Sequence, residues 1–597
     1  MIAFGLVTWK EKNNMSPRRW VTAFFAGLLV LFGLGLFAAV ELPYEKLKFL
    51  LGALTSDGSF NSLKAENFGI FKILFATGGL VFFALAALTG FRRWSVVAAF
   101  MRKLLADAGI FLRGLPPSKK EWGYLAAVLL ITILAIIYRL EYICSSLHHD
   151  EAYTFMAFAH SLRTAITDYH LPNNHIFHSI LLYFSTQLFG IQPWAVRLPA
   201  FIAGVLLVPA IYWLAKRIYN RWTGLAAALL VAFSPLLIGY STNARGYSLV
   251  MLFSLLVFIL GDFVRKEKNL FAWGLISLFS ALGFYTIPVM MFSFGILFIW
   301  LFLENQFADL GPYRSKWEFV RYWLICGFSS AVLTLILYVP ILVYSGPEKL
   351  FGNAFVSPAL WEDVTDNFLY QMAGPWRVFI YQIPVIVAGV LTCGLVLSIL
   401  LHKRLSKHHV LMQVAALVWL IVIVLVQRPK DGSKLWSFLV VLFILWAAAG
   451  IIGLLQMVRF KAVSLAPVAV CLVIGWGIWH AAWLAPQLPE IWKARGDTEN
   501  AVMFVQNQLV EGDRLIVAPP DDAPVWYYAE LHGMPTAAYY ERYTTFNRLF
   551  VLVNSAEDQT PASVIEERGP DPASVDIDLA RQLQVIGNIQ VFEVPHK

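Results

Sequence analysis

Long apolar runs separated by short polar segments make up most of the chain between residues 20 and 485. An α-helix needs about 20 predominantly apolar residues to cross a hydrocarbon core of roughly 30 Å. Most of the runs approach or exceed that length, so the pattern predicts a polytopic α-helical membrane protein with about 13 transmembrane helices. The predicted spans are 20–41, 69–90, 122–142, 197–215, 222–240, 247–264, 270–287, 289–303, 322–345, 379–401, 410–426, 435–456 and 462–485.

The composition supports a membrane protein. Of the 597 residues, 59% are hydrophobic and 14% are charged, whereas soluble proteins hold about 25% charged residues. The net charge of +8 does not indicate a nucleic-acid partner, because the basic residues fall between the spans. The four cysteines lie in or at the ends of apolar spans, which indicates neither a disulfide framework nor a zinc site.

Basic loops set the expected orientation. The loop Arg92–Lys120 carries seven Lys and Arg residues, and Arg265–Lys268 and Lys403–Lys407 are also basic. Such loops are retained in the cytoplasm. This orientation places the stretch His149–Glu151 on the outer side of the membrane.

Two apolar segments compete for one crossing after Glu151. The segment Lys216–Arg221 is basic and therefore expected inside, so only one full crossing fits before it. We assign that crossing to 197–215. The other segment, 175–190, carries several polar side chains and is expected to be an interfacial or half-inserted helix.

The chain divides into three parts. Residues 1–121 hold two N-terminal transmembrane helices and the basic cytoplasmic loop, and residues 122–485 hold the other spans. Residues 486–597 are of mixed polarity and predict a small C-terminal α/β soluble domain, which the count of crossings leaves outside. Within it we expect a helix over 497–509 and strands over 514–518, 549–553 and 590–594. Neither G-x-G-x-x-G nor G-x-x-x-x-G-K-[ST] occurs, so a nucleotide-driven pump or a Rossmann cofactor site is not indicated.

Two adjacent acids, Asp150 and Glu151, follow the predicted span 122–142 on the outer side. A carboxylate beside low-dielectric surroundings has a raised pKa and interacts strongly with nearby cations and proton donors. Such a group suits a general base that takes a proton from a hydroxyl. By local preference alone, Asp150 is also a good N-cap for the helix that begins at Glu151.

A second polar cluster consists of Pro172–His175 and His178. Together with His149 and Asp150, its two histidines could bind a metal, but the chain shows no tight and complete ligand set. Polar anchoring at the membrane interface explains the cluster better. We therefore expect no metal-ligating residue, although the sequence leaves room for a divalent cation near Asp150.

Two outward loops carry cations against the charge bias of the other loops. In Tyr240–Tyr247, the planar guanidinium of Arg245 is well suited to grip a phosphate, or alternatively snorkels to lipid headgroups. The loop Gln427–Lys434 would bind the phosphate of a lipid headgroup, unless the count of spans is wrong at this point. Its three cations are Arg428, Lys430 and Lys434.

These motifs occur in a characteristic order from residue 122 to about residue 260. They are Asp150-Glu151, Pro172-Asn173-Asn174-His175, the stretch Phe189–Ala200, Ser234-Pro235 and the loop Tyr240–Tyr247. In this order they resemble the GT-C superfamily of integral-membrane glycosyltransferases. The resemblance is to the family 39 group in particular, which includes protein O-mannosyltransferases and bacterial aminoarabinose transferases.

The resemblance implies an enzyme that moves a sugar from a polyprenyl-phosphate-linked donor to an extracytoplasmic protein, glycan or lipid acceptor. It implies Asp150 as the general base and Glu151 as a supporting acid. A single displacement would invert the anomeric centre. Relatives of the aminoarabinose type have a Lys and paired prolines in place of Asn173-Asn174-His175, so we expect the phosphate contact from His175, Arg245 or the 428–434 loop.

The topology and the resemblance together imply a bacterial-type plasma-membrane glycosyltransferase with its site and C-terminal domain outside the cytoplasm, and we hypothesise that this domain recognises the acceptor. The alternative is a transporter or lipid flippase, but such proteins usually show repeats with broken helices and ionisable groups inside the spans. We find no internal repeat. Asp150 and Glu151 are the expected catalytic residues. The expected substrate or phosphate contacts are His149, Asn174, His175, Arg245, Tyr247, Arg428, Lys430 and Lys434.

Overall fold

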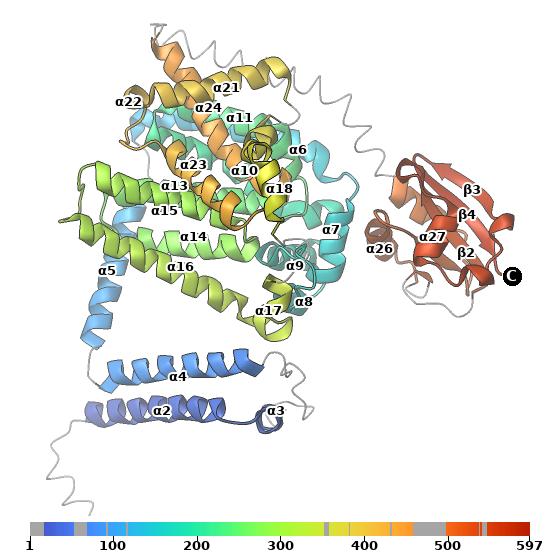
Figure 1. Ribbon diagram of the computed structural model, residues 1–597, viewed down its shortest axis with the longest axis horizontal. Coiled ribbons are helices and arrows are strands. Elements are labelled where there is room, and N and C mark those ends of the chain that lie inside the picture. Colours follow the sequence, from blue (N-terminus) through green and yellow to red (C-terminus); the bar gives the residue numbers. More distant parts are fainter. Residues whose placement is uncertain are drawn as a thin grey trace, which may run out of the picture. The chain divides into compact units, whose positions relative to one another are not determined.

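The computed structural model shows a mainly helical protein with a small β-sheet near the C-terminus (Figure 1). It describes residues 17–52, 68–90, 94–114, 118–351, 358–380, 383–429, 433–457, 497–535, 538–539 and 546–597. The predicted span 462–485 lies outside the described residues. The chain divides into two compact units, of which the first contains Met1–Pro116, Asn269–Ala272 and Tyr338–Asn353, and the second contains the other residues.

Two apolar helices form the centre of the first unit. Helix α2 (Pro17–Val40) packs along α4 (Phe68–Gly90), and the rings of Phe37 and Phe83 stack with centroids 5.6 Å apart. Gly79 allows the close approach, because a Cβ there would lie 2.5 Å from the Phe37 ring. These helices correspond to the first two predicted spans.

The predicted loop Arg92–Lys120 is in part a helix, α5 (Trp94–Arg113). Its Ala, Leu, Met, Lys and Arg residues are strong helix formers, and a count of charges alone does not distinguish a loop from an amphipathic helix. The carboxylate of Asp107 accepts the backbone N–H of Leu270 at 2.7 Å and so fixes α5 to the start of α14 (Leu270–Thr286).

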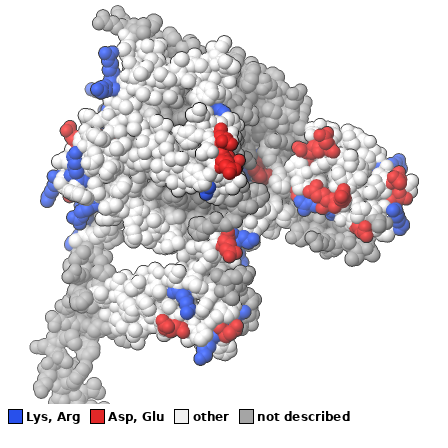
Figure 2. Space-filling view, viewed as in Figure 1, with Lys and Arg blue, Asp and Glu red and all other residues white. Residues whose placement is uncertain are grey.

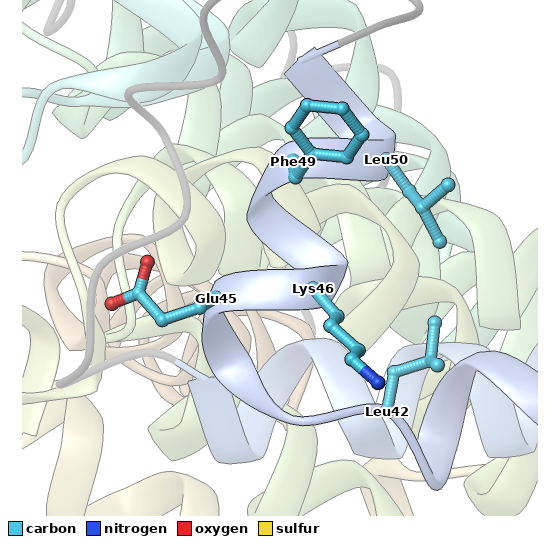
Figure 3. Close-up of a pocket in the computed structure, with 5 residues that line it drawn as sticks. All are labelled: Leu42, Glu45, Lys46, Phe49 and Leu50. Carbon is cyan, nitrogen blue, oxygen red and sulfur yellow. The ribbon is translucent and has the colours of Figure 1, made fainter.

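A surface hollow of about 360 Å³ lies along α3 (Tyr44–Gly52) in the same unit (Figure 3). It is lined by Leu42, Glu45, Lys46, Phe49 and Leu50. None of the residues predicted for the functional site belongs to it.

Helix α10 (Pro193–Ile218) forms the centre of the second unit, where it packs against α6, α9, α11, α12 and α13. Among the described residues, seven helices are long and apolar enough to cross a membrane, or eight if one bent pair counts as a span. The protein is therefore a multi-pass membrane protein, but the predicted number of about 13 spans is not confirmed. Besides α10, the principal helices are α6 (Trp122–Ile143), α9 (Ile176–Phe189), α11 (Arg221–Phe233), α12 (Pro235–Ser241), α13 (Tyr247–Lys266), α15 (Met290–Phe307), α16 (Lys316–Tyr344), α21 (Val385–Leu400), α23 (Met412–Val426) and α24 (Leu439–Met457).

The predicted span 222–240 is broken. Helices α11 and α12 meet at 63°, at Ser234. Pro235 has no N–H and disfavours the helical conformation in the residue before it. Arg139, completely buried on α6, donates to the freed carbonyls of Val231 at 3.3 Å and Ala232 at 2.7 Å, and to the hydroxyl of Ser241 at 2.8 Å. This arginine therefore stabilises an irregular backbone within the apolar helices.

Several charged segments meet at one end of these helices. The Lys407 Nζ donates to the carbonyl of Lys216 at 2.9 Å. The buried carboxylate of Asp262 binds Lys266 at 2.5 Å and His408 at 2.8 Å. Figure 2 shows Lys and Arg gathered at one edge of the helical part, beside a broad uncharged surface. Three of the basic segments predicted to share one side of the membrane therefore lie together, namely Lys216–Arg221, Arg265–Lys268 and Lys403–Lys407.

The C-terminal part is a small α/β domain, as predicted. Its strands are β1 (Arg514–Val517), β2 (Arg548–Asn554), β3 (Arg581–Ile586) and β4 (Ile589–Pro595), in the order β1-β2-β4-β3. Among these four described strands, only the β1–β2 pair is parallel. Helices α26 (Asp522–Leu531) and α27 (Pro561–Arg568) complete it, together with a helix over 497–506. Strand β3 was not predicted, because this largely exposed edge strand lacks a clear apolar alternation.

We expect Arg139→Met to lower the free energy of unfolding by about 2–4 kcal/mol, because it leaves several buried acceptors without a donor. The measurement is equilibrium unfolding of the detergent-solubilised protein. The control Arg314→Met, at an exposed arginine, should stay within about 0.5 kcal/mol of the native protein. Equal stability of the two variants would show that Arg139 does not support the helix break.

Candidate functional site

A short helix carries the two adjacent acids. Helix α7 (His149–Tyr153) runs directly into a π-helical turn over Thr154–Ala159. Glu151 accepts the backbone N–H of the N-cap residue His148 at 3.0 Å. Asp150 therefore lies at the second helical position, and the alternative that it caps the helix is wrong.

Glu151 is completely buried in an ion pair with Arg197, near the start of α10. Two guanidinium nitrogens each donate to a different carboxylate oxygen at 2.8 Å, and the backbone N–H of Ala244 donates to the carboxylate at 2.7 Å. Burial alone would raise the pKa of Glu151, but the Arg197 charge and the hydrogen bonds outweigh burial and lower the pKa to about 2. Glu151 is thus a carboxylate kept ionised in the interior.

The guanidinium of Arg245 joins three segments of the chain. Its Nη1 donates to the Thr154 hydroxyl at 2.9 Å and lies 3.4 Å from the carbonyl oxygen of Asp150. Its Nη2 donates to the Asn173 side-chain oxygen at 3.1 Å. The Asn173 Nδ2 in turn lies 3.4 Å from the Asp150 carboxylate. Three motifs that are far apart in the sequence therefore meet at Asp150.

His175 completes this cluster. Its Nδ1 accepts the backbone N–H of Gly246 at 2.9 Å, and its Nε2 lies 3.2 Å from the Arg245 Nη2. When Nδ1 accepts, a neutral imidazole carries its proton on Nε2, so two donors face each other. An anionic oxygen within reach of both would relieve this contact. Tyr247 contacts the same imidazole edge-on, with ring centroids 5.1 Å apart.

Gly246 is needed for this geometry. A Cβ at this position would lie 2.5 Å from the Thr286 Cγ2 and 3.2 Å from the His175 Cβ. Any other residue would therefore push apart the backbone and the imidazole that it binds.

Asn174 is buried beside the cluster rather than in it. Its amide donates to two backbone carbonyls around α8 (Leu162–Thr167) at 3.0 and 2.7 Å, and its oxygen accepts the Ser179 hydroxyl at 2.8 Å. These hydrogen bonds indicate a structural role for Asn174. The neighbouring Asn173, which the sequence did not single out, is the asparagine that contacts Asp150.

His149 contacts the C-terminal domain. Its Nδ1 lies 3.0 Å from a carboxylate oxygen of Asp522 on α26, and its ring stacks on Tyr153 at 5.8 Å. The Asp522 carboxylate holds the pKa of His149 above its ordinary value. The predicted site residue next to Asp150 is therefore held by a part of the chain more than 350 positions later.

The predicted cationic loop is described only in part. The guanidinium of Arg428 lies over the ring of Trp361, 4.9 Å from its centroid. Lys430 lies outside the described residues, and only the backbone of Lys434 is described, in a 3₁₀ turn over Ser433–Trp436. Among the residues that the structure describes, no group of three or more His, Cys, Asp or Glu could hold a metal ion.

Arg197 is the main residue of this region that the sequence did not single out. It was part of the motif Phe189–Ala200, at the outward start of a predicted span. A lone arginine at the edge of an apolar run generally has a polar partner or lies at the membrane interface. Its position in the sequence therefore indicated a polar partner without identifying it. Which acid it would meet depended on packing between residues 46 positions apart.

Comparison with known proteins gives one family match. Residues 173–314 match the family model described as dolichyl-phosphate-mannose-protein mannosyltransferase. The match includes the segments of Asn173, His175 and Arg245 but not Asp150. A search finds no match among the curated proteins. The family match confirms, over residues 173–314, the resemblance to integral-membrane glycosyltransferases that was predicted from the sequence.

Several solved structures are similar to the chain. ArnT from Cupriavidus metallidurans in the apo state has a TM-score of 0.49 at 11% identity, covering 79% of this chain and 98% of that chain. AglB from Archaeoglobus fulgidus, in complex with an inhibitory peptide and a dolichol-phosphate, has a TM-score of 0.38 at 12% identity, covering 72% and 62%. The arabinofuranosyltransferase AftD from Mycobacteria has a TM-score of 0.40 at 15% identity, covering 81% and 40%.

We expect Glu151→Gln to lower the free energy of unfolding at pH 7 by about 3 kcal/mol, because it leaves the guanidinium of Arg197 buried without its counter-charge. The measurement is chemical denaturation in detergent. Glu141→Gln, at an exposed carboxylate near the end of α6, is the control and should change stability by less than about 0.5 kcal/mol.

The same ion pair predicts a pH dependence. Because the folded pKa of Glu151 is lower than its ordinary value of 4.5, its contribution to stability is fully present above pH 4.5 and is lost as the pH falls toward 2. The native protein should therefore lose more stability than Glu151→Gln over this range. A parallel loss in the two proteins would contradict the assignment.

Proposed function

We propose that the chain is a glycosyltransferase that moves a sugar from a polyprenyl-phosphate-linked donor to an acceptor outside the cytoplasm. The observation that carries this proposal is the meeting of Asp150, Asn173, His175 and Arg245 at one place. The family match over residues 173–314 supports it. The site and the C-terminal domain would face the outer side of a bacterial-type plasma membrane.

Arg245 and His175 would bind the phosphate of the donor. Both present N–H donors, and their facing nitrogens are 3.2 Å apart. Arg245 is buried, so its interaction with an anion would be weakly screened by water. Arg428 lies at the end of α23 and, with Lys430 and Lys434, would supply further positive charge to the lipid phosphate.

Asp150 would act as the general base. Asn173 and the backbone contact to Arg245 hold it at the edge of the cluster, and its side chain is half-buried. The acceptor oxygen attacks the anomeric carbon while the carbon–oxygen bond to the phosphate breaks. The acceptor proton passes to the Asp150 carboxylate, and the polyprenyl phosphate leaves with its negative charge near Arg245. A single displacement of this kind inverts the anomeric centre.

Glu151 would be a positioning residue rather than a proton carrier. Its two carboxylate oxygens are occupied by Arg197, Ala244 and His148, and it has no exposed surface. Its partners fix α7 against α10, and so fix Asp150. Any acceptor that offers a hydroxyl, on a protein, a glycan or a lipid, fits the proposed step.

Asp150→Asn should reduce transfer by about 10²–10⁴-fold, because an amide does not take up the acceptor proton. The measurement is transfer from a panel of radiolabelled undecaprenyl-phosphate sugars into membrane acceptors at matched expression. Binding of undecaprenyl phosphate should persist in the variant. Glu141→Gln should transfer at the native rate. Full activity of Asp150→Asn would overturn the assignment of the base.

Arg245→Met should weaken binding of undecaprenyl phosphate by about tenfold or more, because one hydrogen bond to a charged group contributes about 1.5–3 kcal/mol. Binding can be followed by microscale thermophoresis of the purified protein. The exposed Arg163 provides a matched control, Arg163→Met, which should bind normally. Native affinity in Arg245→Met would remove Arg245 from the phosphate site.

A further inference from the structure

Helix α26 of the C-terminal domain packs directly against α7, which carries Asp150. The hydroxyl of Tyr528 accepts the backbone N–H of Leu147 at 3.0 Å, just before α7 begins. The hydroxyl of the adjacent Tyr527 donates to the carbonyl of Ile191, just before α10 begins. Both tyrosine side chains are completely buried.

Beside these hydrogen bonds, the segment around α7 and the C-terminal domain share a hydrophobic core. Leu147, Ala152 and Phe155 belong to one buried cluster with residues of the C-terminal domain, including Val525 and Tyr527. The rings of Phe155 and Tyr527 meet edge-on, with centroids 5.9 Å apart. The domain and the acid-bearing segment therefore stabilise each other in the way that parts of one core do.

Two polar pairs flank this core. His149 lies 3.0 Å from Asp522, and the Nε2 of His160 lies 3.1 Å from Glu530. Asp522 and Glu530 come from opposite ends of α26, so the helix is tied to the segment 149–160 at two separated points. His149 is the residue next to Asp150.

We propose that the C-terminal domain is a structural part of the active site, in which Asp522 and Tyr528 are positioning residues that hold α7 and orient Asp150. The proposal rests on the proposed function, because it takes Asp150 as the base. It assigns to the domain a role in the reaction itself, besides any role in acceptor recognition.

The His149–Asp522 pair makes this positioning sensitive to pH. His149 is faced by Asp522 on α26 and by Asp150 and Tyr153 on its own helix, while Arg568 on α27 binds the same Asp522 at 3.1 Å. Asp522 raises the pKa of His149, so the charged pair is present at low pH and is lost as the pH rises through that raised pKa. Transfer should therefore decline on the alkaline side as His149 loses its proton.

The first test is amide hydrogen exchange of the full-length protein in lipid nanodiscs, which needs no substrate. Asp522→Asn and Tyr528→Phe should each speed exchange of residues 147–153 by about threefold or more, because the first removes the ion pair with His149 and the second removes the hydrogen bond to Leu147. The exposed carboxylate Asp578 gives the control Asp578→Asn, which should exchange like the native protein. Native exchange rates in both test variants would overturn the proposal, whether or not the chain transfers sugar.

The second test is the pH profile of transfer, using the undecaprenyl-phosphate sugar that the native protein accepts. Asp522→Asn should lower kcat by up to about fivefold, the upper end of the range for a partly exposed ion pair, with undecaprenyl phosphate binding unchanged. Its alkaline limb should move to lower pH, and His149→Gln should lack that limb. A limb that stays in place in Asp522→Asn would overturn the positioning role, whereas absence of transfer with every donor would count against the proposed function alone.

Discussion

The buried ion pair of Glu151 and Arg197 is the interaction on which the rest of the site depends. Besides binding Glu151, Arg197 donates to the carbonyl of Ile143, the last residue of α6, and to that of Ser146 just beyond it, while Glu151 accepts the N–H of Ala244. One pair thus joins the end of α6, the start of α7, the start of α10 and the loop that carries Arg245. Desolvation makes two buried charges costly unless each has its partner, so this arrangement tolerates little displacement.

Buried guanidinium groups also explain how irregular backbone persists among apolar helices. Each carbonyl that a helix break leaves buried away from water must find a donor inside the protein. Arg139 donates to the carbonyl of Ala232 at the break between α11 and α12, and Arg197 donates to the carbonyl of Ser146 just after α6. Arg245 donates to the carbonyl of Asn173 and lies 3.4 Å from that of Asp150. An arginine suits this task because its five N–H donors in a planar fork can reach several carbonyls at once.

The sequence predicted the features that depend on local pattern. Run length located the long helices, and motif order located the segments of Asp150, His175 and Arg245. Features that depend on long-range packing could not be predicted from the sequence. Which of the neighbours Asn173 and Asn174 faces Asp150 depends on where α9 begins and on the carbonyls around α8. The Ser234-Pro235 pair was visible, but the bend and its partner Arg139 follow from contacts about 90 to 100 positions apart.

Because α7 is short, it needs contacts with neighbouring elements on both sides to keep its geometry. Even with the π-helical turn that continues it, the helical segment 149–159 is shorter than the roughly 12–15 residues that an isolated helix needs in water, so it does not hold a fixed geometry alone. On one side, Glu151 binds it to α10; on the other, α26 binds it through Tyr528 and through the pair of His149 with Asp522. The orientation of a base on this segment therefore depends on the contacts with α10 and on those with α26. This argues that the membrane helices and the C-terminal domain act as one site, although their sequences differ so strongly in polarity.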